Sequence, residues 1–574
     1  MRAKTASIVV VAAATCVGCG GGGGAEPRAP VQVNREPVVV GSIPDQQGLA
    51  GHPFALDLNV GGPVFADPDG DPLVYQVNVV QVSSGSTFGV SGATITGILG
   101  PAGSIRVRVL ATDGLGGGPA LVFTLSILPN SAPVVARPNS WLLVAAGQQL
   151  NYDPTQGGSA FTDPDGDRVR YSLRMASPSR GLSIDGTRVI GALGDVGLVT
   201  FELIADDGYG GEATDRFSIA VAAPEPGEPI LPAVPYVYAN EELPLPHLFA
   251  RSDGLRAGVF WDMTPLDNRL TNAGATLGRV LFYDKRLSLT NTHACASCHH
   301  QATGFASPER FNTGAQGVPL KRNSMALANV RYNLRELWFS DQRVASLEAL
   351  VLMPIQEPTE LASFLPLVET KLAATDFYPA LFEAAFGTPE ITRERIAKAL
   401  AQFLRSLITY RAAFDRAYSA MDGLPLPDPA SVLTPEELRG AELFRDFTGT
   451  RCGRCHSDDI QALGGAENNG LDAAVTDPGF QNQGRFRASS LRNIAVTAPY
   501  MHDGRFATLR EVIDHYDHGV MANPHLAERL RVVWNDPTPR RLNLSEADKQ
   551  ALEAFLRTLT DYAFLTDPRF GDPF

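Results

Sequence analysis

Apolar and polar residues alternate one by one along much of residues 36–222, for example at 104–110 and 199–204. A side-chain period of two is that of a half-buried β-strand. Gly, Pro and Asp interrupt these runs at short intervals, and no stretch in this region has a helical period. We therefore expect the first part of the chain to be all-β.

The pattern is made of two copies of one unit. Phe-Ala-Asp-Pro-Asp-Gly-Asp at 65–71 recurs as Phe-Thr-Asp-Pro-Asp-Gly-Asp at 161–167. We predict two β-sandwich domains, residues 36–130 and 131–222, which resemble the cadherin-like and immunoglobulin-like modules of bacterial surface proteins. Two interpretations of the clustered aspartates stay open: carboxylate ligands of calcium, or acidic turns with Pro and Gly at turn positions. No catalytic set of residues stands out here.

The composition changes after residue 222. Residues 223–240 are rich in proline, which predicts an extended, semi-rigid linker. Helical periodicity follows, so we predict a mainly α region in two lobes, residues 241–430 and 431–574. Three helix starts are indicated by a capping residue: Thr392, Thr434 with Pro435 and Glu437, and Ser545 with Asp548, the last opening a final helix.

Length and charge limit the class of protein. A chain of 574 residues is too long for one core. Its formal net charge of −14 argues against a nucleic-acid partner, which selects basic surfaces. The same charge permits a basic protein partner, such as a small electron-transfer protein.

The first residues predict export. Arg2 and Lys4 precede an apolar run at 6–14 that is too short to span a bilayer, as in a signal peptide covering residues 1–19. Cys19 follows a small residue and precedes five glycines, which resembles a bacterial lipoprotein signal, although Cys16 stands where Leu is usual. We expect a lipid anchor on Cys19, a flexible tether at 20–35 and a periplasmic or cell-envelope location, with plain cleavage as the alternative.

Two Cys-x-x-Cys-His motifs carry the chemistry. Two thiols must reach the two vinyl groups of one porphyrin, and the next residue must bring an imidazole to the iron. A zinc site or redox pair uses the two cysteines but has no need of the adjacent histidine. No other cysteine follows residue 19. We therefore predict two covalent c-type haems, attached through Cys295, Cys298 and His299 and through Cys452, Cys455 and His456.

Longer matches surround these motifs, namely Leu-Gly-Arg-Val-Leu-Phe-Tyr-Asp-Lys-Arg-Leu at 277–287 and Leu-Arg-Asn-Ile-Ala-Val-Thr-Ala-Pro-Tyr-Met-His-Asp-Gly-Arg at 491–505. With them, the chain from about residue 266 onward resembles the bacterial di-haem cytochrome c peroxidase and MauG family. The resemblance implies two cytochrome-c-like helical lobes with calcium between them. It also implies a peroxide site at the first haem and a relay or store of oxidising equivalents at the second.

The resemblance singles out the distal side of each haem. Peroxidases that rest in a closed form carry a His after the glycine matching Gly314, whereas this chain has Ala315, so we expect an open first haem. Cytochrome c peroxidases place Met, and MauG-type members Tyr, at the position of Tyr516, which is the expected ligand of the second haem. Phenolate favours oxidised iron more than a thioether does. The rival ligands are His515, His518 and Met521.

The acid–base group of the first haem is expected to be Glu360, which matches the catalytic glutamate of the family, with Glu357 as its rival. Leu350 replaces a companion glutamine. Trp338 lies near the inter-haem tryptophan of the family, and Trp-Phe-Ser-Asp at 338–341 reads as if two residues were inserted. The resemblance places the calcium ligands at Asn323, Thr497 and Pro499 and gives His502 a supporting role.

Three hypotheses of function follow. The first is a peroxidase that reduces hydrogen peroxide with electrons from a small cytochrome or copper protein. The second is a MauG-like oxidase that uses peroxide to oxidise residues of a partner protein. The third is a non-enzymatic di-haem electron carrier with binding modules. We expect the protein to contact the membrane only through the lipid anchor.

Overall fold

The computed structural model describes residues 33–80, 85–192, 194–238, 262, 264–332, 339–418, 427–456, 465–487, 490–533 and 535–574. The signal peptide, Cys16, Cys19 and Trp338 lie outside the described residues, so the predictions for them stay predictions. The chain forms two compact units. The first ends at Ala136 and also contains Phe161–Arg170 and Ala205–Ala213; the second contains the rest.

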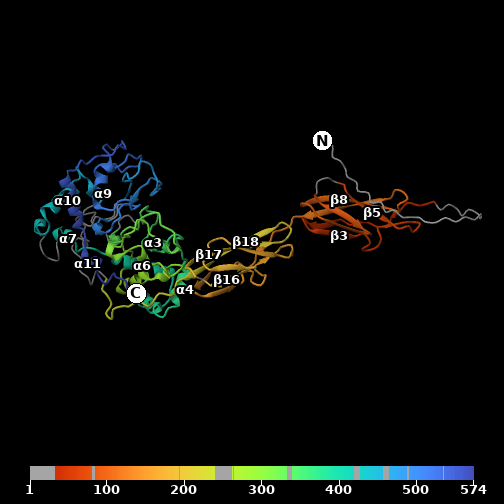
Figure 1. Ribbon diagram of the computed structural model, residues 1–574, viewed down its shortest axis with the longest axis horizontal. Helices are drawn as coiled ribbons and strands as arrows, with labels where there is room; N and C mark the ends of the chain where they lie inside the picture. Colours follow the sequence, from red (N-terminus) through yellow and green to blue (C-terminus); the bar gives the residue numbers. More distant parts are fainter. Residues whose placement is uncertain are drawn as a thin grey trace, which may run out of the picture. The chain divides into compact units, whose positions relative to one another are not determined.

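Both predicted β-sandwiches are present, and the second repeats the strand order of the first. A four-stranded sheet, β2-β9-β8-β5, is accompanied by a three-stranded sheet, β3-β7-β6, in the first copy, and the second copy has β11-β18-β17-β14 with β12-β16-β15. In both copies the edge strand of the larger sheet pairs in parallel with the last strand. Figure 1 labels strands of both copies. The strands are β1 Val38–Val39, β2 Gln46–Leu49, β3 Pro53–Asp57, β4 Phe65–Ala66, β5 Val74–Val79, β6 Thr87–Ser91, β7 Thr94–Ile98, β8 Gly103–Thr112, β9 Ala120–Leu128, β10 Val134–Val135, β11 Leu142–Ala145, β12 Gln149–Tyr152, β13 Phe161–Thr162, β14 Arg170–Met175, β15 Leu182–Asp185, β16 Arg188–Ala192, β17 Gly197–Asp206 and β18 Glu212–Ala222.

The predicted alternation is seen in the burial of β8 and β17. Val107 and Val109 of β8 and Val199 and Phe201 of β17 are fully buried, and the residues between them face outward or are half-buried. One face of each strand therefore supplies the core of its sandwich.

The repeated aspartate motif forms the same turn twice. Asp67 Oδ1 accepts hydrogen bonds from the backbone N–H of Asp69 and Asp71, at 2.7 and 3.1 Å. Asp163 Oδ1 does the same for the equivalent residues 165 and 167, at 2.8 and 3.2 Å. Both copies thus form an acidic turn, and calcium binding by these aspartates stays a prediction.

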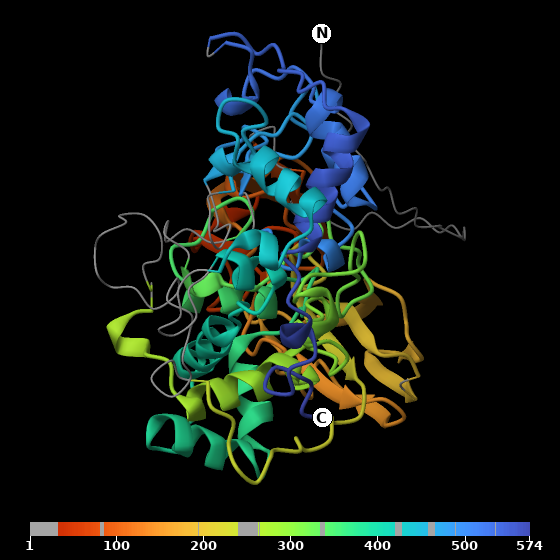
Figure 2. The same cartoon turned by 90° about the vertical axis from the view of Figure 1, so that its left-hand side faces the viewer.

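The haem region is helical and forms two lobes, seen as the green and blue bodies of Figure 2. Thr392, Thr434 and Ser545 cap their helices as predicted, and a one-turn helix follows the expected final one. The first lobe contains α2 Asn272–Tyr283, α3 Leu347–Gln356, α4 Leu365–Ala373, α5 Tyr378–Phe386 and α6 Arg393–Ser406. The remaining helices are α7 Ala413–Tyr418, α8 Pro435–Arg445, α9 Leu509–Asp514, α10 Glu546–Arg557 and α11 Tyr562–Leu565.

Each lobe is built on one close helix crossing at a glycine. A Cβ on Gly278 of α2 would lie 2.0 Å from the Ala399 oxygen of α6. A Cβ on Gly440 of α8 would lie 1.9 Å from the Ala551 oxygen of α10. Only glycine allows backbones to approach this closely. The two lobes thus share one packing device.

Segments distant in sequence complete the first lobe. Phe564, Leu565 and Phe570 belong to its hydrophobic core although they follow the second haem motif. The Pro-rich segment also lies along this lobe: Ile230 N donates to Pro573 O at 2.6 Å, and Tyr238 N donates to Asn272 Oδ1 at 2.7 Å. Among the helices that the structure describes, none is long and apolar enough to cross a bilayer.

Candidate haem sites

The first Cys-x-x-Cys-His motif forms a single tight turn, η3 (Cys295–Ser297). The backbone N–H groups of Cys298 and His299 both donate to the Cys295 oxygen, at 3.1 Å each. His299 Nδ1 lies 2.9 Å from the Phe305 oxygen; because a carbonyl only accepts, Nδ1 is the donor and Nε2 is left for a metal. Burial lowers the pKa of His299, which keeps the imidazole neutral, as ligation requires.

The second motif repeats this turn in η7 (Cys452–Arg454). Cys455 N and His456 N donate to the Cys452 oxygen at 3.2 and 3.1 Å. None of the four described cysteines forms a disulfide, and all four are half-buried. Two pairs of free thiols, each followed by a histidine in a tight turn, fit two covalent haems.

The structure brings Glu360 to the first haem motif. Burial raises the pKa of the Cys298 thiol to about 12, and the nearby Glu360 carboxylate adds to this shift. Burial likewise raises the pKa of Glu360 to about 7, with a further increase from Glu357 and an opposing effect of Arg343. A carboxyl group that titrates near neutrality can both accept and return a proton.

Ala315 lies directly against Glu360. Its backbone N–H donates to the Glu360 oxygen at 2.7 Å, and a Cβ on Gly314 would lie 2.0 Å from the Thr359 oxygen. The turn that contains Ala315 is thus packed on the loop between α3 and α4, residues 357–364, which we name the acid–base loop. Ala315 is buried and offers only a methyl group, so it cannot ligate iron.

The rival Glu357 is differently placed. Its side chain is exposed, and its Oε1 accepts a hydrogen bond from Thr359 Oγ1 at 3.1 Å. It is therefore placed in solvent, away from the buried position of Glu360. His300 is exposed and Leu350 half-buried, as expected for residues without a ligand role.

Tyr516 lies at the second haem motif, on a π-helical turn, η9 (His515–Gly519), that continues α9. Burial raises the pKa of its phenol to about 12, the Cys455 and Cys452 thiols adding to the shift and a hydrogen bond with the Asn469 side chain opposing it. Single π-turns inside helices are frequent at functional sites. Asn469, which sequence patterns did not single out, is hydrogen-bonded to this phenol through its side chain.

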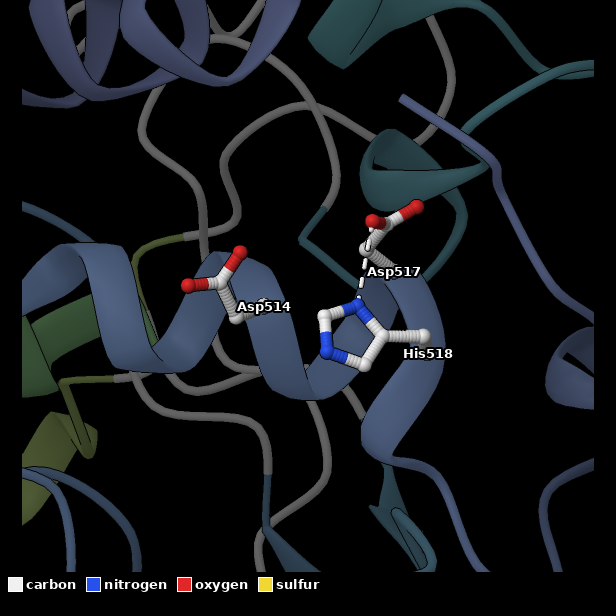
Figure 3. A group of neighbouring side chains, drawn as sticks. All are labelled: Asp514, Asp517 and His518. Atoms are coloured by element: carbon white, nitrogen blue, oxygen red, sulfur yellow. Dashed lines mark hydrogen bonds and ion pairs between the residues drawn. The ribbon is translucent and has the colours of Figure 1, made fainter. Parts of the chain in front are cut away.

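The rival ligands of the second haem point elsewhere. His515 Nε2 is 3.1 Å from the Asn469 oxygen, and Met521 is 47% exposed. The side chain of His518 is 65% exposed and is paired with Asp517 at 3.2 Å (Figure 3).

Figure 3 also shows Asp514 beside this pair. The three residues have the composition of a metal site, but Lys549 Nζ lies 2.6 Å from Asp514 and 2.8 Å from Asp517. An ammonium group already neutralises these carboxylates. We therefore assign no metal to this group of side chains.

The residues predicted to bind calcium lie on two segments that meet between the lobes. Asn323 N donates to the His502 oxygen at 2.8 Å, shortly after Thr497 and Pro499 in the chain. Asn323 Nδ2 donates to the Glu309 oxygen at 2.8 Å, which leaves Oδ1 for a cation. The His502 ring stacks on Phe486 at 3.8 Å, consistent with a supporting role.

Comparisons with known proteins agree with this geometry. The family model for di-haem cytochrome c peroxidase matches residues 272–422. The methylamine utilization protein MauG of Methylorubrum extorquens is 33% identical over 304 residues, covering 51% of this chain and 80% of that protein. Cytochrome c551 peroxidase of Nitrosomonas europaea is 30% identical over 299 residues, covering 50% of this chain and 79% of that protein.

A solved structure of a MauG-like protein associated with microbial copper homeostasis is 30% identical, with a TM-score of 0.47, and covers 56% of this chain and 99% of that one. The residues matched by the family model include the first Cys-x-x-Cys-His turn. The chain belongs to the di-haem cytochrome c peroxidase and MauG family of periplasmic oxidoreductases and carries two c-type haems.

Proposed function

We propose that the chain reduces hydrogen peroxide at the first haem, with Glu360 as the acid–base group and electrons from a protein donor relayed through the second haem. The observation that carries this proposal is the position of Glu360. Its carboxylate interacts electrostatically with Cys295 and Cys298, and burial raises its pKa to about 7. When bound, the haem supplies the iron that binds peroxide and passes two electrons to it.

Glu360 would move the proton. Its carboxylate accepts a proton from the peroxide oxygen nearer the iron and returns it to the departing oxygen, which leaves as water. With two electrons and two protons in total, hydrogen peroxide becomes two molecules of water. Near pH 7 the group is present in both forms, which suits a residue that must accept and donate in turn.

Ala315 keeps the distal side of the first haem free of a protein ligand. The hydrogen bond from its N–H to the Glu360 oxygen also ties this segment to the acid–base loop. We infer that the oxidised protein reacts with peroxide as isolated, without prior reduction.

The remaining assignments belong to the same proposal. Tyr516 is the distal ligand of the second haem, and Asn323, Thr497 and Pro499 hold one calcium ion between the lobes. Cys19 anchors the protein in the cell envelope through lipid. The donor is a small cytochrome or copper protein.

A second function is favoured by Tyr516. A phenolate ligand disfavours reduction of the second iron, which makes this haem a poor acceptor from an ordinary cytochrome. A MauG-like oxidation of a partner protein uses peroxide without that step, and two MauG proteins are 33% and 30% identical to this chain. Because the family is enzymatic, the electron-carrier hypothesis is not retained.

Stopped-flow mixing of the ferric protein with peroxide tests the proposal. Glu360→Gln should slow the reaction by at least about tenfold, whereas Glu357→Gln, the matched control, should stay near the wild-type rate. Cyanide binding at the first haem should survive in both variants. A wild-type rate in Glu360→Gln would place the proton shuttle elsewhere. Turnover with a reduced cytochrome, against covalent change in a co-purified protein, separates the two functions.

A further inference from the structure

The second β-sandwich is packed against the first haem lobe. Ala220 of β18, Leu289 and Leu367 of α4 form a buried cluster, and the ring of Trp141 meets the ring of Phe364 edge-on at 4.3 Å. Leu143, Leu198 and Ala362 pack against the same cluster. We name these eight residues the docking cluster. Figure 1 shows α4 beside the strands of the second sandwich.

The segment that leaves β18 is bonded to the same lobe. Ala223 N donates to the Thr290 oxygen at 2.8 Å, and Asn291 Nδ2 donates to Glu225 Oε1 at 3.0 Å. The buried guanidinium of Arg286 donates to the oxygens of Pro226 and Gly227 and pairs with Glu225 at 3.1 Å. The Arg286 contacts use the backbone carbonyls of Pro226 and Gly227.

Residues 286–291 are themselves held rigidly from within the lobe. The buried ammonium of Lys371 donates to the Ser288 oxygen at 2.8 Å and to Asn291 Oδ1 at 2.6 Å. Asp284, with no exposed surface, pairs with Arg286 at 3.1 Å. A contact on one side of this segment is therefore transmitted to the other side rather than absorbed by flexible side chains.

The other side of the segment is the peroxide site. Leu289 N donates to the Leu361 oxygen at 2.9 Å, and Thr290 Oγ1 donates to the Ala315 oxygen at 3.4 Å. Leu361 follows Glu360 in the acid–base loop, and Ala315 N is bonded to the Glu360 oxygen. Two hydrogen bonds thus link the backbone of Ala223 to that of Ala315, one to the Thr290 oxygen and one from Thr290 Oγ1.

We propose that the second β-sandwich is a structural part of the first haem site, in which Trp141 and Ala223 act as positioning residues that hold residues 289–290 against the acid–base loop and the Ala315 segment. This inference rests on the proposed role of Glu360. On this inference the second β-sandwich positions residues of the haem lobe, in addition to any role as a spacer or in attaching the protein to the cell envelope. A module that docks here sets how firmly the loop excludes water around Glu360, and therefore the proton affinity of that group.

The test uses the full-length protein and hydrogen–deuterium exchange read at the amides of Leu289 and Ala315. Trp141→Ala should raise exchange at both amides by at least about tenfold, whereas Trp141→Phe, which keeps an aromatic ring, should leave it within about twofold. Ala223→Pro removes one N–H donor and should raise exchange at Ala315 in the same direction. Phe88→Ala is the matched control, because Phe88 pairs edge-on with Phe54 at 6.0 Å within the first sandwich.

A second reading is the pH profile of the reaction with peroxide. Loosening the loop admits water, so Trp141→Ala should move the midpoint of the profile toward the ordinary glutamate value, and Phe88→Ala should not. Unchanged exchange at Leu289 and Ala315 in both Trp141→Ala and Ala223→Pro would overturn the inference, as would equal effects of Phe88→Ala. Exchange does not depend on the chemistry of Glu360. A normal rate in Glu360→Gln therefore refutes the proposed function alone, and the exchange data still decide the inference.

Discussion

The backbone N–H of Ala315 donates a 2.7 Å hydrogen bond to the backbone oxygen of Glu360. The residue proposed to leave the first haem open and the residue proposed to move the proton are thus joined directly. Gly314 makes the contact possible, because a Cβ there would lie 2.0 Å from the Thr359 oxygen and 2.6 Å from that of Glu360. The proposed open coordination position and the proposed proton transfer therefore both depend on the packing of residues 314–315 against residues 359–360.

The reaction with peroxide should depend on pH with a midpoint near 7. Accepting a proton requires the carboxylate form of Glu360, and burial raises its pKa to about 7. The second-order rate constant should therefore increase as pH rises through that value and level off above it. Stopped-flow measurements between pH 5 and 9 check this (a range of roughly two units on either side of the midpoint). Persistence of the same midpoint in Glu360→Gln would assign it to another group.

Ala315→His should close the first haem. The bond from its N–H to the Glu360 oxygen holds residue 315 against the acid–base loop, and an imidazole here would supply the ligand atom that a methyl group lacks. We expect a six-coordinate ferric haem and cyanide binding slowed by at least about tenfold, because a protein ligand must first leave. Paramagnetic resonance and cyanide kinetics measure both effects. Ala315→Leu, which adds similar bulk without a ligand atom, should keep the five-coordinate spectrum.

Tyr516→Met should raise the reduction potential of the second haem. A thioether replaces an anionic oxygen, so reduced iron is favoured relative to the wild type. Spectroelectrochemical titration gives the potential of each haem separately. Tyr516→Phe is the control for loss of the ligand, because it keeps the buried ring near Cys452 and Cys455. Identical spectra in wild type, Met and Phe variants would remove Tyr516 from the ligand set.

Gly440→Ala should destabilise the second lobe selectively. The added methyl would lie 1.9 Å from the Ala551 oxygen, so α8 and α10 must separate. Overpacking of this kind costs roughly 1–3 kcal/mol of unfolding free energy. Thermal unfolding followed at each haem should show the loss at the second haem only, and Gly278→Ala should show the reverse. Glu442→Ala, on the exposed face of α8, should change neither transition.

His52 should make the first unit more stable at low pH. Burial opposes its charge, but hydrogen bonds to Asp167 and the Ala50 oxygen outweigh it and raise the pKa of His52 above 6.5. Both ring nitrogens face acceptors, at 2.8 and 3.1 Å, so the charged form is the bonded one. The stabilisation is fully present below pH 6.5 and is lost as pH rises through the folded value.

His52→Phe provides the measurement, because it keeps a ring on Tyr209, which stacks at 3.6 Å. Exchange at amides of the first unit should differ between wild type and variant at pH 5 and converge at pH 9 (roughly 1.5 units below and 2.5 above the ordinary histidine value). A difference that did not change with pH would contradict the assignment.

Much of this arrangement follows from local sequence. Alternation in β8 and β17 predicted the buried Val107 and Phe201, because one strand face must enter a core. The Cys-x-x-Cys-His spacing identified both haem turns. Alignment with the family pattern singled out Glu360 and Tyr516, and in the structure each interacts electrostatically with cysteines of one motif.

Other contacts have no local signal. Trp141 and Phe364 are more than two hundred residues apart, and neither lies in a motif, so their contact arises only from the tertiary fold. Asn469 acts on Tyr516 through a single side-chain bond. Asn469 lies in an irregular segment, where no periodic pattern of apolar and polar residues marks one position over another.

The location of Phe564, Leu565 and Phe570 in the core of the first lobe has a consequence for biogenesis. These residues are synthesised and exported after Cys452 and Cys455, so the first lobe lacks part of its interior until both attachment motifs have emerged. Vectorial folding, in which one lobe matures before the next arrives, is thereby prevented. On this order of synthesis, we expect the two lobes to reach their final form together.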